Sequence, residues 1–286
     1  KIGEALRKED RITVIKDGKK VITEKKEKLT EKDIIFHMTG RVLEAGEKEH
    51  VFIENGKKPV LSLKNFSVGI VNNVNLDVYK GEILAIFGLM GSGRTTLAKG
   101  LFGLERFKGE VFLEGRKVTI SSPTEAINLG IGYIPEDRRS GLVYQFPVSA
   151  NITLAILKEI SKRGVLDLGR EVEISKKYVE ILKIKTPSVF QKVLYLSGGN
   201  QQKVVFGRWL LSQAQVFIFD EPTKGIDVGA KSEIYKLVTD LAKAGKAVIY
   251  ITNEIQEVLG ICDSIIVMHR GRITAELQAR ETTYEE

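Results

Sequence analysis

Hydrophobic and polar positions alternate between residues 60 and 79, whereas short runs further along the chain are apolar throughout. The alternating runs 60–66 and 74–78 predict antiparallel strands with one buried face. The apolar runs are typical of strands that are covered on both faces of a parallel sheet, and they lie at 83–87, 216–219, 248–251 and 265–268.

Apolar residues recur every three or four positions in several of the intervening segments, which predicts helices. One helix is expected to end near Leu101, and a helical block covers 149–185. A hairpin is predicted around Glu114-Gly115. Strands that alternate with helices favour an α/β fold with a mostly parallel sheet. We expect an antiparallel β subdomain beside it and a helical subdomain inserted at about residues 139–195.

Residues 4–33 resemble residues 257–286 at a constant offset of 253 positions, without gaps. The identical pairs are Glu4 and Glu257, Leu6 and Leu259, Asp10 and Asp263, Ile12 and Ile265, Val14 and Val267, Gly18 and Gly271, and Thr30 and Thr283. We interpret residues 1–50 as the C-terminal tail of a preceding copy of the same domain and residues 51–286 as a complete copy. A chance resemblance between two strand-turn-strand units is the alternative.

Local signals in the first copy agree with this interpretation. Asp17-Gly18 between apolar runs predicts a hairpin turn. Thr30 predicts the N-cap of a helix that runs through Met38 and is closed by Gly40. The chain is therefore expected to stop where the matching helix of the second copy begins.

Composition narrows the classes of function. The 286 residues are 43% hydrophobic and carry a net charge of +7, as in ordinary globular proteins. Lysines near the start alternate with glutamates and apolar residues, which favours a solvated face over a nucleic-acid site, so no nucleic-acid partner is expected. The single cysteine, Cys262, excludes an intramolecular disulfide. No apolar run approaches the ~20 residues that span a bilayer.

A glycine-rich loop follows the run 83–87 and opens the next helix. Its pattern, Gly88-x4-Gly93-Arg94-Thr95, is that of a P-loop, whose backbone N–H groups wrap phosphates at a helix N-terminus. This predicts a P-loop NTPase core, in which Thr95 provides a hydroxyl for Mg²⁺. Arg94 stands where the motif has lysine, and its guanidinium is larger and planar. The predicted phosphate-binding residues are Gly88, Gly91, Ser92, Gly93, Arg94, Thr95 and Thr96.

Two carboxylates follow the apolar run 216–219. Asp220 is expected to hold Mg²⁺ at the carboxyl edge of the sheet, and Glu221 to polarise an attacking water. The alternative is that this pair only caps the following helix.

Leu196-Ser197-Gly198-Gly199 precedes a helix and predicts a second anion site. The residues expected to bind there are Ser197, Gly198, Gly199, Asn200 and Gln201. A plain serine N-cap with a flexible glycine pair is the alternative. The helical subdomain would hold this site away from the chain's own P-loop, so we expect it to serve the nucleotide of a partner domain.

Together these motifs resemble the nucleotide-binding domain of ATP-binding cassette (ABC) transporters over about residues 60–280. The variants Pro135-Glu136-Asp137-Arg138 and the run from Lys224 to Lys231 are most similar to the C-terminal half of tandem ATPase subunits of bacterial monosaccharide importers. The resemblance implies ATP and Mg²⁺ as cofactors, and a peripheral position on the cytoplasmic face of the inner membrane. It also implies three partners: the N-terminal nucleotide-binding domain of the same polypeptide, packed head to tail; membrane permease subunits; and, indirectly, a periplasmic sugar-binding protein.

Besides Arg94, the chain departs from that family at three places. Glu136 stands where glutamine is usual, and Asn253 stands where histidine is usual. Both are carried over as catalytic candidates, and Glu136 also as a candidate metal ligand. Gly69 and Ile70 lie where an aromatic residue would stack on adenine. We hypothesise an asymmetric pair of domains, in which this P-loop binds and hydrolyses ATP poorly. The alternatives are a non-hydrolysing regulatory half and a soluble ABC ATPase not engaged in transport.

Overall fold

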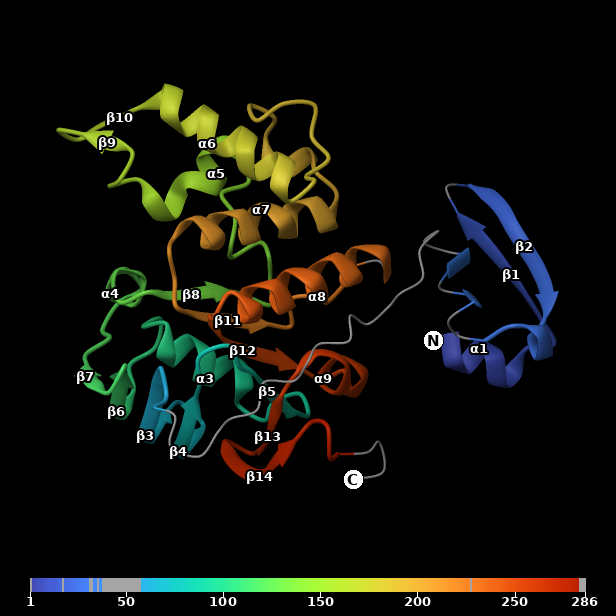
Figure 1. The fold of residues 1–286 in the computed structure, drawn as a ribbon, viewed down its shortest axis with the longest axis horizontal. Coiled ribbons are helices and arrows are strands. Elements are labelled where there is room, and N and C mark those ends of the chain that lie inside the picture. Colours follow the sequence, from blue (N-terminus) through green and yellow to red (C-terminus); the bar gives the residue numbers. More distant parts are fainter. Residues whose placement is uncertain are drawn as a thin grey trace.

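The computed structural model describes residues 2–16, 18–30, 33, 34, 36, 37, 58–226 and 228–282. These residues form a small N-terminal unit and a larger body that begins at residue 58 (Figure 1). Within these described ranges no helix is both long and apolar enough to cross a membrane.

The body is built on a six-stranded sheet with the order β14-β13-β5-β12-β11-β8. Its strands are β5 (Ile83–Gly88), β8 (Ile131–Ile134), β11 (Val216–Asp220), β12 (Ala247–Thr252), β13 (Ser264–His269) and β14 (Arg272–Gln278). All neighbours are parallel except β13 and β14. This confirms the mostly parallel sheet, although the short strand β8 was not among the predicted runs.

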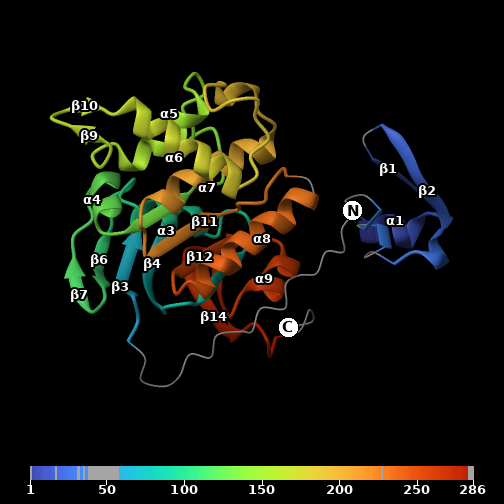
Figure 2. The same ribbon diagram turned by 45° about the horizontal axis from the view of Figure 1, so that its top comes forward.

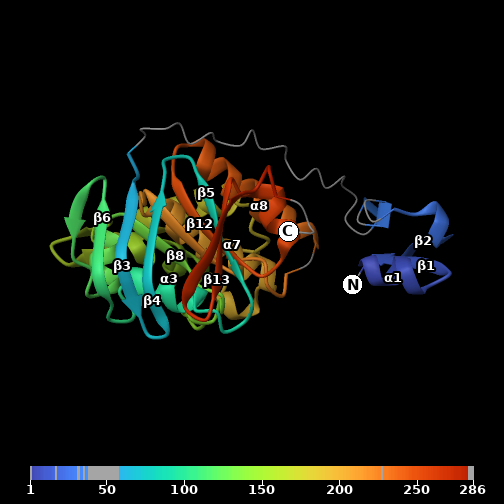
Figure 3. The same ribbon diagram turned by 90° about the horizontal axis from the view of Figure 1, so that it is seen from below.

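A second, antiparallel sheet has the order β4-β3-β6-β7. It comprises β3 (Leu61–Val68), β4 (Val71–Val78), β6 (Lys108–Leu113) and β7 (Arg116–Val118). Figure 3 shows β3, β4 and β6 side by side. The predicted hairpin at Glu114-Gly115 is confirmed, because Leu113 pairs with Arg116 across it. Phe66 is fully buried and stacks on Phe107 at 4.7 Å, as a residue of the core.

Some helices cover the main sheet, and others form a group at one end of the body. The covering helices are α3 (Arg94–Leu101), α4 (Pro123–Asn128), α8 (Val228–Lys243) and α9 (Ile255–Ile261). The end group contains α5 (Val148–Thr153), α6 (Leu168–Ile181) and α7 (Gly198–Leu211), and Figures 1 and 2 show it away from β3 and β4. Of these helices, α7 also packs against β8 of the main sheet. The group also holds a short hairpin, β9 (Ser161–Lys162) and β10 (Val165–Leu166), which the helical periodicity did not predict.

The N-terminal unit repeats the end of the body element by element. It contains α1 (Ile2–Lys8), β1 (Arg11–Lys16) and β2 (Lys19–Lys25), and α9, β13 and β14 begin and end 253 positions later. The bulge between Val14 and Ile15 recurs between Val267 and Met268. The hairpin predicted at Asp17-Gly18 is confirmed by the pairing of β1 with β2, although Asp17 itself lies outside the described residues.

The two copies differ in their surroundings. β13 pairs with β5 on one side and β14 on the other, whereas β1 pairs with β2 in a two-stranded sheet. Ile15 is consequently 66% exposed, while its counterpart Met268 is 1% exposed. Thr30 accepts a hydrogen bond from the Asp33 backbone at 3.2 Å and donates to the Asp33 carboxylate, which agrees with the predicted N-cap. The predicted end of that helix, Met38 to Gly40, lies outside the described residues.

Candidate functional site

The P-loop runs from the end of β5 to the start of α3, and its glycines are required by the backbone. Gly88 lies so close to β13 that an added Cβ would be 2.4 Å from the carbonyl oxygen of Met268. Gly91 and Gly93 have φ values of +82° and +103°, which disfavour any side chain. Gly93 is the N-cap of α3, so the first N–H groups of that helix face the loop.

Ser92 is the P-loop residue that best fits a phosphate ligand. Its side chain is 4% exposed, and its hydroxyl has no hydrogen-bond partner among the described residues. Buried hydroxyls are ordinarily paired, so this orphan group suits an anionic oxygen placed in the loop. The loop is supported from behind, because Gly271 in the β13–β14 turn donates its N–H to the carbonyl oxygen of Ser92 at 2.8 Å.

Thr95 and Asp220 meet at the carboxyl edge of the sheet, as predicted. The Thr95 hydroxyl donates to Oδ1 of Asp220 at 3.1 Å, and the Tyr133 hydroxyl donates to Oδ2 at 3.1 Å. Burial raises the pKa of Asp220 to about 6, although these hydrogen bonds act in the opposite direction. A hydroxyl beside a buried carboxylate forms the oxygen-donor set that Mg²⁺ prefers. The sequence did not reveal Tyr133, because it lies on the unpredicted strand β8.

Glu221 follows directly and has a strained backbone. Its φ is +47°, and its N–H donates to the Ile251 carbonyl oxygen at 2.9 Å across the sheet. Positive φ at a residue with a side chain costs free energy, and such strain is enriched at functional sites. Burial raises the pKa of Glu221 above its ordinary value, and the charge of Arg94 opposes that shift.

Arg94 does not extend along the P-loop but reaches across the sheet edge. One guanidinium nitrogen lies 3.1 Å from Oε1 of Glu221, and the other donates to the carbonyl oxygen of Thr252. Arg94 and Glu221 are 8% and 9% exposed, so this ion pair is shielded from water. Arg94, the cation of the P-loop, is therefore paired with Glu221, the residue expected to polarise water.

Two departures from the family pattern, Glu136 and Asn253, lie near this pair. Glu136 forms an exposed ion pair with Lys224, and its charge contributes to raising the pKa of Asp220. Asn253 is exposed immediately after β12. Thr96 lies under the β3–β4 turn, since a Cβ added to Gly69 would be 3.0 Å from its methyl group. The structure thus brings the residues of the P-loop, β11 and β12 to one edge.

The second anion site begins α7. Ser197 occupies the N-cap position but makes no capping bond with its side chain, and its hydroxyl instead accepts from Nδ2 of Asn200 at 2.8 Å. Gln201 accepts from Nε of Arg138 at 3.2 Å. The Arg138 guanidinium lies against Gly198, where an added Cβ would be 3.1 Å from it. Among the hydrogen bonds and ion pairs of the described residues, none joins Ser197–Gly199 to the P-loop.

Comparisons with known proteins agree with this geometry. The sequence pattern of the family described as ABC transporter matches residues 71–224. The xylose import ATP-binding protein XylG of Thermoanaerobacter pseudethanolicus is 43% identical over 296 residues, covering 100% of this chain and 58% of that protein. The L-arabinose transport ATP-binding protein AraG of Geobacillus stearothermophilus is 42% identical over 299 residues, with coverages of 100% and 58%.

A solved structure described as a nucleotide-free ATP-binding cassette from an ABC transporter superposes with a TM-score of 0.66. It is 25% identical and covers 78% of this chain and 93% of its own. The present chain spans little more than half the length of XylG and AraG.

Proposed function

The chain belongs to the ABC transporter family, and from that premise we propose that it binds Mg-ATP as one half of a subunit that powers monosaccharide import. The observation that carries this proposal is the meeting of Thr95, Asp220 and Glu221 beside a P-loop with an orphan buried hydroxyl at Ser92. The names of the similar proteins XylG and AraG, which specify xylose import and L-arabinose transport, support the sugar class.

Each group at the site then has a role. The backbone N–H groups of the P-loop and the Ser92 hydroxyl would hold phosphate oxygens. Thr95 and Asp220 would hold Mg²⁺, which together with ATP supplies a polarised terminal phosphoryl group. Glu221 would orient a water molecule and accept its proton, provided that it is released from Arg94. Glu136 and Asn253 would flank this position from neighbouring loops.

Two observations support an impaired site in this half. The guanidinium of Arg94 is held by Glu221 and by the Thr252 carbonyl oxygen, so both the cation and the base are engaged with each other. Asn253 cannot become a cation or carry a proton as histidine does. In this proposal Ser197–Gly199 serves the ATP of a partner domain, because the free N–H groups at the start of α7 lack a capping side chain.

The repeat supports a tandem arrangement of two such domains. The elements α1, β1 and β2 begin and end 253 positions before α9, β13 and β14, and the similar proteins are longer than this chain by a margin that admits a second domain. We propose that residues 1–50 close a preceding nucleotide-binding domain, that residues 51–286 form the second, and that the two domains pack head to tail.

The helical subdomain offers a surface for membrane subunits. Phe146, Phe190 and Tyr195 are 49%, 67% and 69% exposed. The Val193 N–H donates a hydrogen bond to the carbonyl oxygen of Phe146, which joins the segment of Phe146 to the segment that contains Phe190 and Tyr195. Exposed aromatic side chains of this kind are typical of protein contacts. We propose that permease subunits dock here at the cytoplasmic face of the inner membrane, with a periplasmic sugar-binding protein acting on their far side.

The test is the affinity for Mg-ATP and the steady-state hydrolysis of this chain, measured beside Glu221→Gln. Weak binding without Glu221-dependent turnover is the expected result. Rapid turnover that depends on Glu221 would overturn the impaired site, and absence of any nucleotide binding would overturn the proposed function. A non-hydrolysing regulatory half is the second candidate, favoured by the Arg94–Glu221 pair. Glu221-dependent hydrolysis in the two-domain protein with only this site intact would exclude it.

A further inference from the structure

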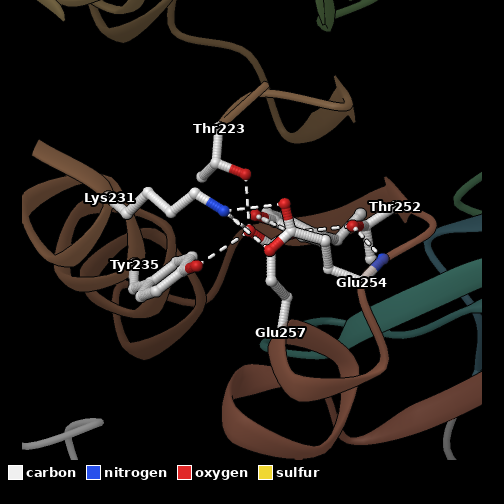
Figure 4. Close-up of polar contacts among 7 residues, drawn as sticks. Thr223, Lys231, Tyr235, Thr252, Glu254 and Glu257 are labelled. Atoms are coloured by element: carbon white, nitrogen blue, oxygen red, sulfur yellow. Dashed lines mark hydrogen bonds and ion pairs between the residues drawn. The ribbon is translucent and has the colours of Figure 1, made fainter. Parts of the chain in front are cut away.

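Glu257, on α9, is a buried carboxylate surrounded by hydroxyl groups. It is 3% exposed. Its Oε1 accepts from Thr223 and from Tyr235 at 2.7 Å, and its Oε2 accepts from Thr252 at 2.7 Å and from Tyr250 at 3.1 Å. Lys231 approaches to 3.6 Å (Figure 4). Nothing in the proposed ATP chemistry uses this group, although every hydroxyl around it points at the carboxylate.

These partners come from three segments besides α9 itself. Thr223 lies two residues after Glu221, in the loop that follows β11. Thr252 ends β12 and directly precedes Asn253. Lys231 and Tyr235 lie on the first two turns of α8. One carboxylate therefore joins the Glu221 loop, the Asn253 turn and α8.

The same turn is held from the P-loop side. The carbonyl oxygen of Thr252 accepts from Arg94, while its hydroxyl donates to Glu257 and accepts from the Glu254 N–H at 3.0 Å. Arg94 and Glu257 thus hold the same residue through different atoms. If bound phosphate displaced Arg94, Thr252 would lose a hydrogen bond and could shift, and Glu257 would pass this shift on to α8.

We propose that Glu257 is a positioning residue that makes the Glu221 loop, the Asn253 turn and α8 respond together to the nucleotide. The inference rests on the proposed function, because it takes Mg-ATP as the ligand of the P-loop. Hydrogen bonds to a buried charge are stronger than neutral ones and poorly screened, so the carboxylate can transmit a shift that a neutral amide transmits weakly.

The experiment compares Glu257→Gln with wild type and with the matched control Glu254→Gln. Glu254 pairs with the same Lys231 at 2.6 Å but at the surface, outside the buried hydroxyl cluster. Hydrogen exchange is followed by mass spectrometry in the P-loop, in residues 250–257 and in α8, with and without Mg-ATP. A fluorescent ATP analogue gives the affinity.

In wild type and in Glu254→Gln, Mg-ATP is expected to slow exchange in all three segments. In Glu257→Gln we expect the affinity to fall roughly tenfold, and saturating Mg-ATP to slow exchange in the P-loop but no longer in α8. Glu257→Asp, which restores the charge, should recover part of the response of α8. A full response of α8 in Glu257→Gln would overturn the inference.

Two other outcomes, a variant that does not fold and a P-loop that does not respond to Mg-ATP, need tests of their own. If Glu257→Gln does not fold, Thr223→Val removes one donor, and exchange is then also followed in the Glu221 loop. Mg-ATP should no longer slow exchange in that loop while α8 still responds; an unchanged response of the Glu221 loop would overturn the inference. If the wild-type P-loop does not respond to Mg-ATP, the proposed function fails. In that case the inference is tested by hydrogen exchange without nucleotide. Glu257→Gln should exchange faster than wild type in both residues 250–257 and α8, and rates equal to those of wild type would overturn the inference.

Discussion

At the scale of single residues, Asp220 shows what burial does to the carboxylate that we propose as a ligand of Mg²⁺. Its carboxylate is fully buried and has two hydroxyl donors but no cation in direct contact among the described residues. Burial raises its pKa from 3.8 to about 6. The folded protein therefore keeps a proton on Asp220 at a pH where the unfolded chain has lost it, so the stability that this proton provides is lost as the pH rises from about 4 through about 6.

Asp220→Asn should remove this dependence. Without Mg²⁺, the free energy of unfolding of wild type should fall between pH 4 and pH 8 by about 2–3 kcal/mol more than that of the variant. Urea unfolding in the presence of a chelator at a series of pH values measures the difference. Asp240→Asn, at an exposed carboxylate on α8, serves as the control and should follow wild type. Identical pH profiles for Asp220→Asn and wild type would contradict the assignment.

The ion pair between Arg94 and Glu221 makes a second residue-scale prediction. Arg94→Lys replaces a planar fork by a compact ammonium, which suits phosphate and is less suited to hold Glu221 and the Thr252 carbonyl together. Mg-ATP should bind about tenfold more tightly to this variant, by isothermal titration. Arg94→Gln breaks the same ion pair without supplying a cation and should bind more weakly than wild type. Tighter binding by both variants would mean that release of Glu221, and not the shape of the cation, limits affinity.

The residues predicted from the sequence were those carried by short local patterns. Thr95, Asp220 and Glu221 lie next to a glycine loop or at the end of an apolar run, so spacing alone located them. Tyr133 and Glu257 gain their roles from contacts with residues far away in the chain, and no local pattern marks them. The direction of the Arg94 side chain likewise depends on β12, which the P-loop motif does not contain.

At the scale of elements, the β13–β14 turn supports the P-loop. Gly271 has a φ of +76°, and a Cβ added to it would lie 1.9 Å from the carbonyl oxygen of Ile70. Its N–H bonds to Ser92, and its carbonyl oxygen accepts from Asn72 at 2.8 Å. The turn therefore connects the phosphate loop with the antiparallel sheet.

The repeat provides an internal control for this turn. Gly18 occupies the matching position with a φ of +75°, but a Cβ there would meet nothing within 4 Å. Gly18→Ala should destabilise its hairpin by only about 1 kcal/mol of backbone strain, measured by hydrogen exchange of β1. Gly271→Ala should destabilise the body by at least about 3 kcal/mol in urea unfolding, because backbone must move. Equal effects would show that the contact with Ile70 is unimportant.

Prediction of elements succeeded where periodicity was strong and long. β5, β11, β12 and β13 were expected within one residue of their observed bounds, and β3 and β4 within three residues. β8 was missed because its four residues, including a glycine, are too few to establish a period. The hairpin of β9 and β10 was hidden within a helical block, since each of its strands has only two residues.

At the scale of the whole molecule, the two copies of the helix–hairpin unit differ in what they bury. Lysine at Met268 would place a charge in the core beside β5, whereas lysine at Ile15 would face solvent. Met268→Lys should therefore destabilise the body by about 3 kcal/mol or more, and Ile15→Lys should leave its unfolding unchanged. Thermal and urea unfolding of the two variants provide the comparison. In a two-domain protein Ile15→Lys should become as harmful as Met268→Lys, and continued tolerance there would contradict the tandem arrangement.

The repeated unit also means that one chain contains two similar hairpins, β1–β2 and β13–β14. Only one edge of β5 is available for pairing with them, because β12 occupies the other. An exchange of hairpins between two molecules would leave every hydrogen-bond ladder complete, which is the condition for domain swapping. What discriminates between the hairpins is the side chains on the covered face. Ile266 is 4% exposed where the first copy has the polar Thr13. We therefore expect β13–β14 and not β1–β2 to occupy this edge, because Thr13 would place a hydroxyl where the apolar side chain of Ile266 is buried.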